Sequence, residues 1–81
     1  MRLDKYLKVS RIIKRRSIAN EVCDASRIMA NDRVVKASYQ VAVGDILTVT
    51  IGDRTNTYEV LSIEEAVGKD AARNMSRQLN I

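Results

Sequence analysis

The chain has 81 residues, no histidine, a single cysteine and a formal net charge of +4. A chain of this length supports one modest hydrophobic core, so we expect a single domain over residues 1–81 and little room for an enzyme's concave pocket. The absence of histidine removes the side chain most often used for proton transfer near neutral pH and the commonest metal ligand. The sequence therefore predicts a protein that is not an enzyme and that holds neither a cofactor nor a metal.

The cysteine content and the hydropathy pattern predict a soluble cytoplasmic protein. A lone thiol, Cys23, cannot form an internal disulfide, which favours an intracellular address. No stretch approaches the roughly 20 apolar residues that span a bilayer, and the first residues lack the apolar run of a signal peptide. We therefore expect no contact with a membrane, and we expect Cys23 to be a buried thiol without a chemical role.

The positive charge is concentrated at the N-terminus. Residues 1–16 carry seven basic side chains against Asp4 alone, whereas residues 17–81 carry seven basic and nine acidic ones. A basic cluster on an otherwise slightly acidic chain is typical of a polyanion binder and favours nucleic-acid binding, although charge runs on helices are usually only solvated faces. The candidate phosphate-binding residues are Arg2, Lys5, Lys8, Arg11, Lys14, Arg15 and Arg16.

Two helices are expected at the start of the chain. Leu3, Tyr6 and Leu7 recur at helical spacing and give the first helix an apolar side, while its basic residues fall on another side. The second helix is expected to begin at Ser17 as its N-cap. Its apolar stripe comprises Ile18, Ala19, Val22 and Cys23. Arg15 and Arg16 then lie at the positive end of a helix dipole, where a phosphate binds readily, although two arginines that only point into water fit this feature equally well.

The rest of the chain predicts a small sheet and a final helix. Strands are expected over residues 27–30 and 33–36, joined by a turn at Asn31 and Asp32, because both residues tolerate a positive φ. Further strands are expected over residues 46–51 and 58–63, followed by a polar linker over 64–69 and a short helix over 70–79. The fold class is therefore α+β, with two N-terminal helices packed on a mostly antiparallel sheet.

The sequence offers no signal for nucleotide or single-stranded base recognition. The three glycines are isolated and do not form a phosphate-binding loop, and the three tyrosines are too far apart to form a stacking platform. These features favour recognition of RNA shape and backbone.

The opening motif Arg2-Leu3-Asp4-Lys5-Tyr6-Leu7 resembles the S-four (S4) type RNA-binding domain. Ser10-Arg11, Arg16-Ser17-Ile18-Ala19 and Val43-Gly44-Asp45 extend the resemblance over about residues 1–51, the expected motif core, with an additional strand and the C-terminal helix in 52–81. The resemblance implies two helices and a small sheet that hold structured RNA. The family commonly has Gly where this chain has Ser26 and Asp32, so two turns depart from the pattern.

The resemblance is strongest to stand-alone family members of bacterial ribosome-associated quality control, through Lys14-Arg15-Arg16 and Ala72-Arg73-Asn74-Met75. It implies a monomer that binds a large ribosomal subunit carrying peptidyl-tRNA and a stalled nascent chain. Such a protein contacts large-subunit rRNA and tRNA while a partner quality-control factor directs alanine tailing. Arg2 and Arg16 are then the principal RNA contacts, and the other five basic residues support them.

Three other functions fit the basic cluster. A generic chaperone of structured RNA would bind free RNA, a protein-interaction module would bind an acidic partner, and a DNA-binding domain would be competed by duplex DNA. The last is the weakest, because the sequence shows no convincing helix-turn-helix.

Overall fold

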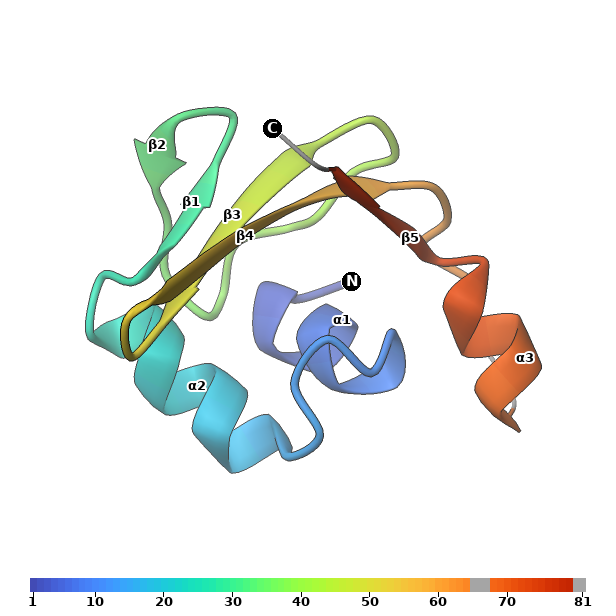
Figure 1. Ribbon diagram of the computed structural model, residues 1–81, viewed down its shortest axis with the longest axis horizontal. Coiled ribbons are helices and arrows are strands. Elements are labelled where there is room, and N and C mark those ends of the chain that lie inside the picture. The colour runs from blue at the N-terminus through green and yellow to red at the C-terminus, as the bar shows by residue number, and fades with distance from the viewer. Residues whose placement is uncertain (65–67, 80–81) are drawn as a thin grey trace.

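The computed structural model describes residues 1–64 and 68–79, except the side chain of Lys69. In chain order the elements are α1 (Leu3–Val9), α2 (Arg16–Asp24), β1 (Ile28–Ala30), β2 (Arg33–Val34), β3 (Ile46–Ile51), β4 (Arg54–Val60), α3 (Gly68–Arg73) and β5 (Ser76–Leu79). The strands form one antiparallel sheet in the order β2-β1-β3-β4-β5, and α1 and α2 lie against one face of that sheet (Figure 1). The expected α+β class and the packing of two N-terminal helices on an antiparallel sheet are confirmed.

The hydrophobic core lies between α1, α2 and the sheet. Leu3, Tyr6 and Leu7 of α1 are fully buried, as their spacing predicted. From α2 the core takes Ala19 and Cys23, and from the sheet it takes Ile28, Ala30, Leu47, Val49 and Val60. Leu47 and Val49 alternate with half-buried threonines along β3, so one face of the sheet is apolar and the other is polar.

Backbone carbonyls, rather than a side chain, cap the start of α1. The amide of Leu3 donates to the carbonyl of Tyr39 at 2.8 Å, and the amide of Asp4 donates to that of Ala37 at 3.2 Å. Arg2 forms an isolated antiparallel bridge with Gln40. The first helical amides, which have no intrahelical partner, are thus satisfied by residues 37–39, and Arg2 is fixed at the edge of the core.

The predicted turn at Asn31 and Asp32 is confirmed. Both residues have positive φ, 52° and 68°, as the favoured two-residue hairpin turn between β1 and β2 requires. Asn31 also receives a hydrogen bond from the amide of Ile46 at 3.0 Å and donates to Asp45 at 3.1 Å. Asp32 therefore takes the place of the usual glycine without loss of the hairpin.

Helix α2 corrects two details of the sequence prediction. It begins at Arg16 with Arg15 as the N-cap and no side-chain cap, so Ser17 is a first-turn residue and not the N-cap. Ile18 is 41% exposed and does not belong to the apolar stripe. The helix turns only a narrow face, centred on Ala19 and Cys23, toward the core.

The C-terminal third differs most from the prediction. The returning strand β4 begins at Arg54 and ends at Val60, so Leu61 and Ile63 lie beyond it and are 41% and 37% exposed. The predicted helix over 70–79 is wrong in its second half, because Ser76–Leu79 form β5 along the free edge of β4. Helix α3 instead begins at Gly68, inside the predicted linker, whose residues 65–67 lie outside the described residues. Tertiary pairing with β4 outweighs the helical spacing of the apolar residues here.

None of the helices within the described ranges combines the length and the apolar character needed to span a lipid bilayer.

Candidate nucleic-acid interface

The buried carboxylate of Asp4 joins the two arginines that the sequence singled out. One carboxylate oxygen accepts from Arg2 Nε at 3.2 Å and from the Lys5 amide at 2.9 Å. The other accepts from Arg16 Nε at 3.3 Å and from Asn20 Nδ2 at 3.4 Å. One side chain thus links α1 to the start of α2, and both guanidinium groups are anchored to the same point.

The exposure of these side chains shows which part remains open to a ligand. The side chain of Asp4 is only 4% exposed, whereas those of Arg2 and Arg16 are 47% and 50% exposed. Both arginines use Nε in the recorded bonds to Asp4. Their terminal nitrogens are therefore available for the bidentate contact with phosphate that suits a guanidinium group.

Electrostatics keep Asp4 ionised inside this cluster. Burial alone raises the pKa of its carboxyl, but hydrogen bonds from Arg16, Asn20, Arg2 and the Lys5 amide outweigh burial and leave the pKa below its ordinary value. The carboxylate consequently offsets part of the repulsion between two neighbouring guanidinium groups. It also sits in the first turn of α1, where the helix dipole favours a negative charge.

The other predicted residues lie along the same part of the chain, and of these Lys5 also reaches Asp4, through its backbone amide. Lys5 is half-buried and Lys8 is exposed, both on α1. Arg11, Lys14 and Arg15 are exposed on the connection between α1 and α2, which Ile13 holds to the core. The seven basic residues therefore come from the N-cap of α1, α1 itself, the connection and the first turn of α2. The structure brings Arg2 and Arg16 together through their shared partner, Asp4.

Two residues of this region were not singled out as site residues from the sequence. Asn20 lies one helical turn after Arg16 and donates to Asp4; its i, i+4 spacing from Arg16 is the signal that could have found it. Arg73 is exposed at the end of α3 and shares the lining of a pocket with Arg11. No local pattern relates Arg73 to Arg11, since only the folded C-terminal segment brings them close.

Other candidate chemistry is sparse in the described part of the chain. No group of three or more His, Cys, Asp or Glu side chains there is placed to hold a metal ion. Cys23 is fully buried, and burial raises the pKa of its thiol to about 11, with the carboxylates of Asp4 and Asp24 adding to the shift. The predicted burial of Cys23 is confirmed, and a buried thiol with a raised pKa is a poor nucleophile.

Comparison of the sequence with known proteins identifies the family of the chain. Residues 1–47 match the model of the S4 domain. The chain is 49% identical over 75 residues to the RQC P-site tRNA stabilizing factor of Bacillus subtilis, which covers 93% of this chain and 87% of that protein. It is 47% identical over 75 residues to the factor of the same name from Halalkalibacterium halodurans, covering 93% and 85%.

Two solved structures have the same fold as this chain. The trimeric structure of heat shock protein 15 from Vibrio cholerae superposes with a TM-score of 0.87 at 28% identity, covering 98% of this chain and 81% of that one. The solution structure of the hypothetical protein HP1423 superposes with a TM-score of 0.83 at 25% identity, covering 100% and 99%. The chain therefore belongs to the S4 domain family and, within it, to the family of the RQC P-site tRNA stabilizing factors.

Proposed function

We propose that this protein binds tRNA on the large ribosomal subunit and stabilises it there during ribosome-associated quality control. The observation that carries the proposal is the anchoring of Arg2 and Arg16, from two helices, by the buried carboxylate of Asp4. The names of the relatives, which describe stabilizing factors of the P-site tRNA, support the same function.

The mechanism is positioning without a chemical step. Arg2 and Arg16 act as the principal contacts to RNA phosphates, because their bond to Asp4 fixes each guanidinium before RNA arrives and lowers the entropy cost of binding. The supporting phosphate contacts are Lys5, Lys8, Arg11, Lys14 and Arg15. Such contacts hold the register of an RNA duplex and read no base sequence, which suits a protein that holds structured RNA.

The biological substrate is a large subunit that carries peptidyl-tRNA and a stalled nascent chain. The protein contacts large-subunit rRNA and the tRNA together, as a monomer in the cytoplasm, while a second factor directs alanine tailing of the nascent chain. We treat residues 1–81 as one domain, because β4 and β5 extend the sheet of β1 and β3, and Met75 enters the same core.

Co-sedimentation with isolated large subunits tests this function. Wild type is expected to sediment with subunits that carry a P-site tRNA, and Arg16→Ala is expected to stay at the top of the gradient. Arg33→Ala is the matched control, since Arg33 is exposed on β2 and has no place in the Asp4 cluster. Binding must weaken at high salt, because phosphate contacts release counterions.

Three outcomes contradict the proposal. Wild type at the top of the gradient removes the ribosomal role and leaves a general RNA-binding protein. Binding that survives ribonuclease points to a protein partner. Equal losses for Arg16→Ala and Arg33→Ala mean that net charge, and not the anchored arginine, drives binding.

A further inference from the structure

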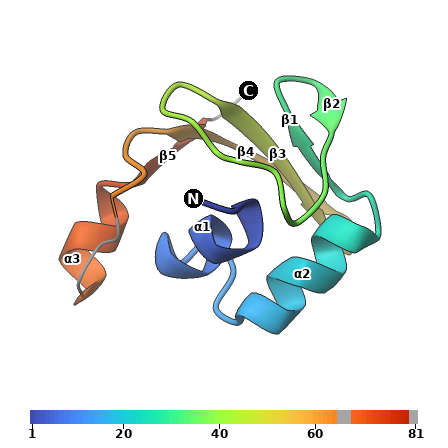
Figure 2. The same cartoon turned by 180° about the vertical axis from the view of Figure 1, so that it is seen from behind.

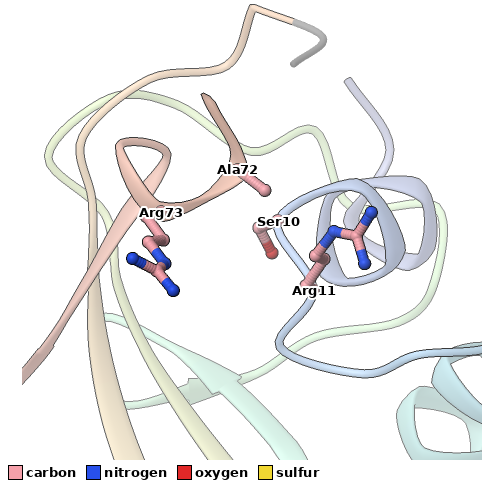
Figure 3. Close-up of a pocket in the computed structure, with 4 residues that line it drawn as sticks. All are labelled: Ser10, Arg11, Ala72 and Arg73. Carbon is pink, nitrogen blue, oxygen red and sulfur yellow. The ribbon is translucent and has the colours of Figure 1, made fainter. Parts of the chain in front are cut away.

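A second basic feature lies on the other side of α1 from α2. In both views of the fold α1 lies between α2 and α3 (Figures 1 and 2). Where the end of α1 faces α3, a shallow pocket of about 340 Å³ is lined by Ser10, Arg11, Ala72 and Arg73 (Figure 3). Residues more than sixty positions apart in the sequence thus present two arginines around one hollow.

The backbone that carries Arg73 is fixed to α1. Tyr6 Oη donates to the carbonyl of Met75 at 2.6 Å, and the amide of Leu61 donates to the same carbonyl at 2.8 Å. Ala72, directly before Arg73, is 2% exposed, and Met75, two residues after Arg73, is 1% exposed. The end of α3 is therefore held at a set distance from α1, while the side chain of Arg73 stays exposed.

Neither arginine of the pocket has an acidic counterpart in the described structure. The ion pairs recorded there use Arg2, Arg16 and Arg77, and none uses Arg11 or Arg73. Asp4 is already occupied by Arg2 and Arg16, and Asp70 in the first turn of α3 makes no recorded ion pair. Two arginines that line one hollow and make no ion pair within the described residues create a positive potential there that favours an anion.

We propose that Arg11 and Arg73 bind one RNA phosphate in this pocket, so that the C-terminal segment adds a contact to the RNA interface. The inference rests on the proposed function and extends it. Figure 3 shows the guanidinium of Arg73 beside the hollow and that of Arg11 turned back along α1. Exposed side chains reorient within nanoseconds, so both guanidinium groups can turn toward a bound phosphate.

The position of the pocket argues for RNA as the ligand. Arg11 belongs to the basic segment of residues 1–16, and its amide donates to the carbonyl of Lys8 at 3.1 Å. The pocket is therefore continuous with the candidate nucleic-acid interface through the end of α1. An RNA backbone that binds the basic residues of α1 and continues past Arg11 therefore reaches Arg73.

Equilibrium binding to large subunits separates Arg73 from a matched control. Arg73→Ala is expected to weaken binding about five- to tenfold, the usual effect of a lost charge-assisted contact. It should also reduce the slope of log affinity against log salt by about 0.7–0.9, the value for one phosphate. Arg77→Ala removes the same charge four positions away, where Arg77 is paired with Glu59 on β4, and should leave both quantities unchanged.

A double-mutant cycle tests whether the two arginines share one phosphate. The loss in Arg11→Ala/Arg73→Ala is expected to be smaller than the product of the two single losses, because the second truncation removes a contact that is already weakened. Strictly multiplicative losses overturn the shared phosphate.

Two sets of large subunits, with and without P-site tRNA, identify the source of the phosphate. The same assay separates failure of this inference from failure of the proposed function. If the phosphate is ribosomal, Arg73→Ala binds more weakly than wild type even to large subunits without tRNA. If the phosphate belongs to the tRNA, Arg73→Ala binds more weakly only to subunits that carry P-site tRNA. If wild type binds and Arg73→Ala equals Arg77→Ala, this inference fails while the proposed function stands. If wild type does not bind, the proposed function fails first. Should Arg73→Ala lower the melting temperature, Arg73→Lys carries the test, because it retains the charge and loses the bidentate contact.

Discussion

Tyr6 in α1 donates its hydroxyl to the carbonyl of Met75 at 2.6 Å, across 69 positions of sequence. Tyr6 is fully buried, and Met75 is 1% exposed directly before β5. The helix that carries Lys5 and Lys8, and that Arg2 precedes as the N-cap residue, is therefore bonded to the C-terminal segment. Stability of that segment and presentation of the basic surface depend on the same contact.

We expect Tyr6→Phe to lower the free energy of unfolding by about 1 kcal/mol, the usual net value of a buried hydrogen bond. The loss is limited because the Met75 carbonyl still accepts from the amides of Leu61 and Ser62. Urea unfolding measures it. Tyr58→Phe is the matched control, since Tyr58 is only partly buried and its hydroxyl takes part in no hydrogen bond recorded for the described residues.

The same tyrosine predicts a loss of stability in alkali. Burial raises the pKa of Tyr6 to about 12, above the value of about 10 in an unfolded chain. The folded protein keeps a proton that the unfolded chain releases, so the contribution to stability is complete below pH 10 and disappears as pH rises toward 12. Unfolding curves between pH 9 and about 12 should show a smaller pH dependence for Tyr6→Phe than for wild type. An unchanged dependence contradicts the assignment.

Asp4→Asn tests the anchor of the two arginines. The amide keeps the shape of the side chain but loses the charge that pairs with Arg2 and Arg16, so we expect binding to large subunits to weaken about fivefold. Stability should fall by about 1–2 kcal/mol, because four partly buried donors lose a charged acceptor. Asp53→Asn, in the exposed turn after β3, is the control for net charge.

Acid titration provides a second test of Asp4. Its pKa is lowered in the folded protein, so its contribution to stability is present above the unfolded pKa of about 4 and is lost as pH falls through the folded value. The free energy of unfolding should therefore decrease below about pH 4, and less steeply in Asp4→Asn. Some acid dependence must remain, because hydrogen bonds from Ala42, Tyr39 and Asn31 outweigh burial and also lower the pKa of Asp45. Equal slopes for wild type and Asp4→Asn contradict the prediction.

A ranking of the basic residues separates anchored from free cations. Arg2→Ala and Arg16→Ala should each weaken binding about tenfold, whereas Lys8→Ala should weaken it about threefold, because a lysine lacks the rigid fork of a guanidinium group. Lys8 is also exposed and is absent from the Asp4 cluster. Binding isotherms on large subunits with P-site tRNA measure the ranking. Equal losses at all three positions would show that only charge matters.

Sequence patterns predicted the elements whose residues are set by local chemistry. The alternation from Ile46 to Ile51 gave β3 with its observed bounds, and Asn31 and Asp32 gave the turn, because side-chain type dictates both. The C-terminal third was not predictable in this way. Ser76–Leu79 form a strand only because β4 offers a free edge, and the spacing of Ala72, Met75 and Leu79 also fits a helix.

The same distinction applies to the candidate interface. The basic residues of 1–16 were visible as charge, but the role of Asp4 was not, because its link to Arg16 depends on the path of the connection between α1 and α2. That path includes a positive φ of 64° at Arg11, and an arginine does not predict a left-handed backbone. No sequence pattern marks Arg73 as a site residue, because only the contact between Met75 and Tyr6 brings it near Arg11.

The end of α2 offers a stabilising substitution. Ser26 has a φ of 61°, and its amide donates to the carbonyl of Cys23 while the amide of Arg27 donates to that of Val22, the paired bonds of a Schellman motif. A side chain in this left-handed conformation costs roughly 1–2 kcal/mol, which glycine avoids. Since glycine also gains entropy in the unfolded chain, we expect Ser26→Gly to stabilise the protein by about 0.5–1 kcal/mol.

Thermal unfolding of Ser26→Gly should show a rise in melting temperature of about 2–8 °C for a domain of this size. Ala25→Gly is the opposing control, because Ala25 has a φ of −80° that any residue adopts, and glycine there only adds entropy to the unfolded chain. It should lower the melting temperature by a similar amount. Ser26→Ala should bring no gain, since its Cβ remains in the left-handed region. If Ser26→Gly and Ala25→Gly shift the melting temperature in the same direction, the left-handed backbone at Ser26 is not what limits the stability of this turn.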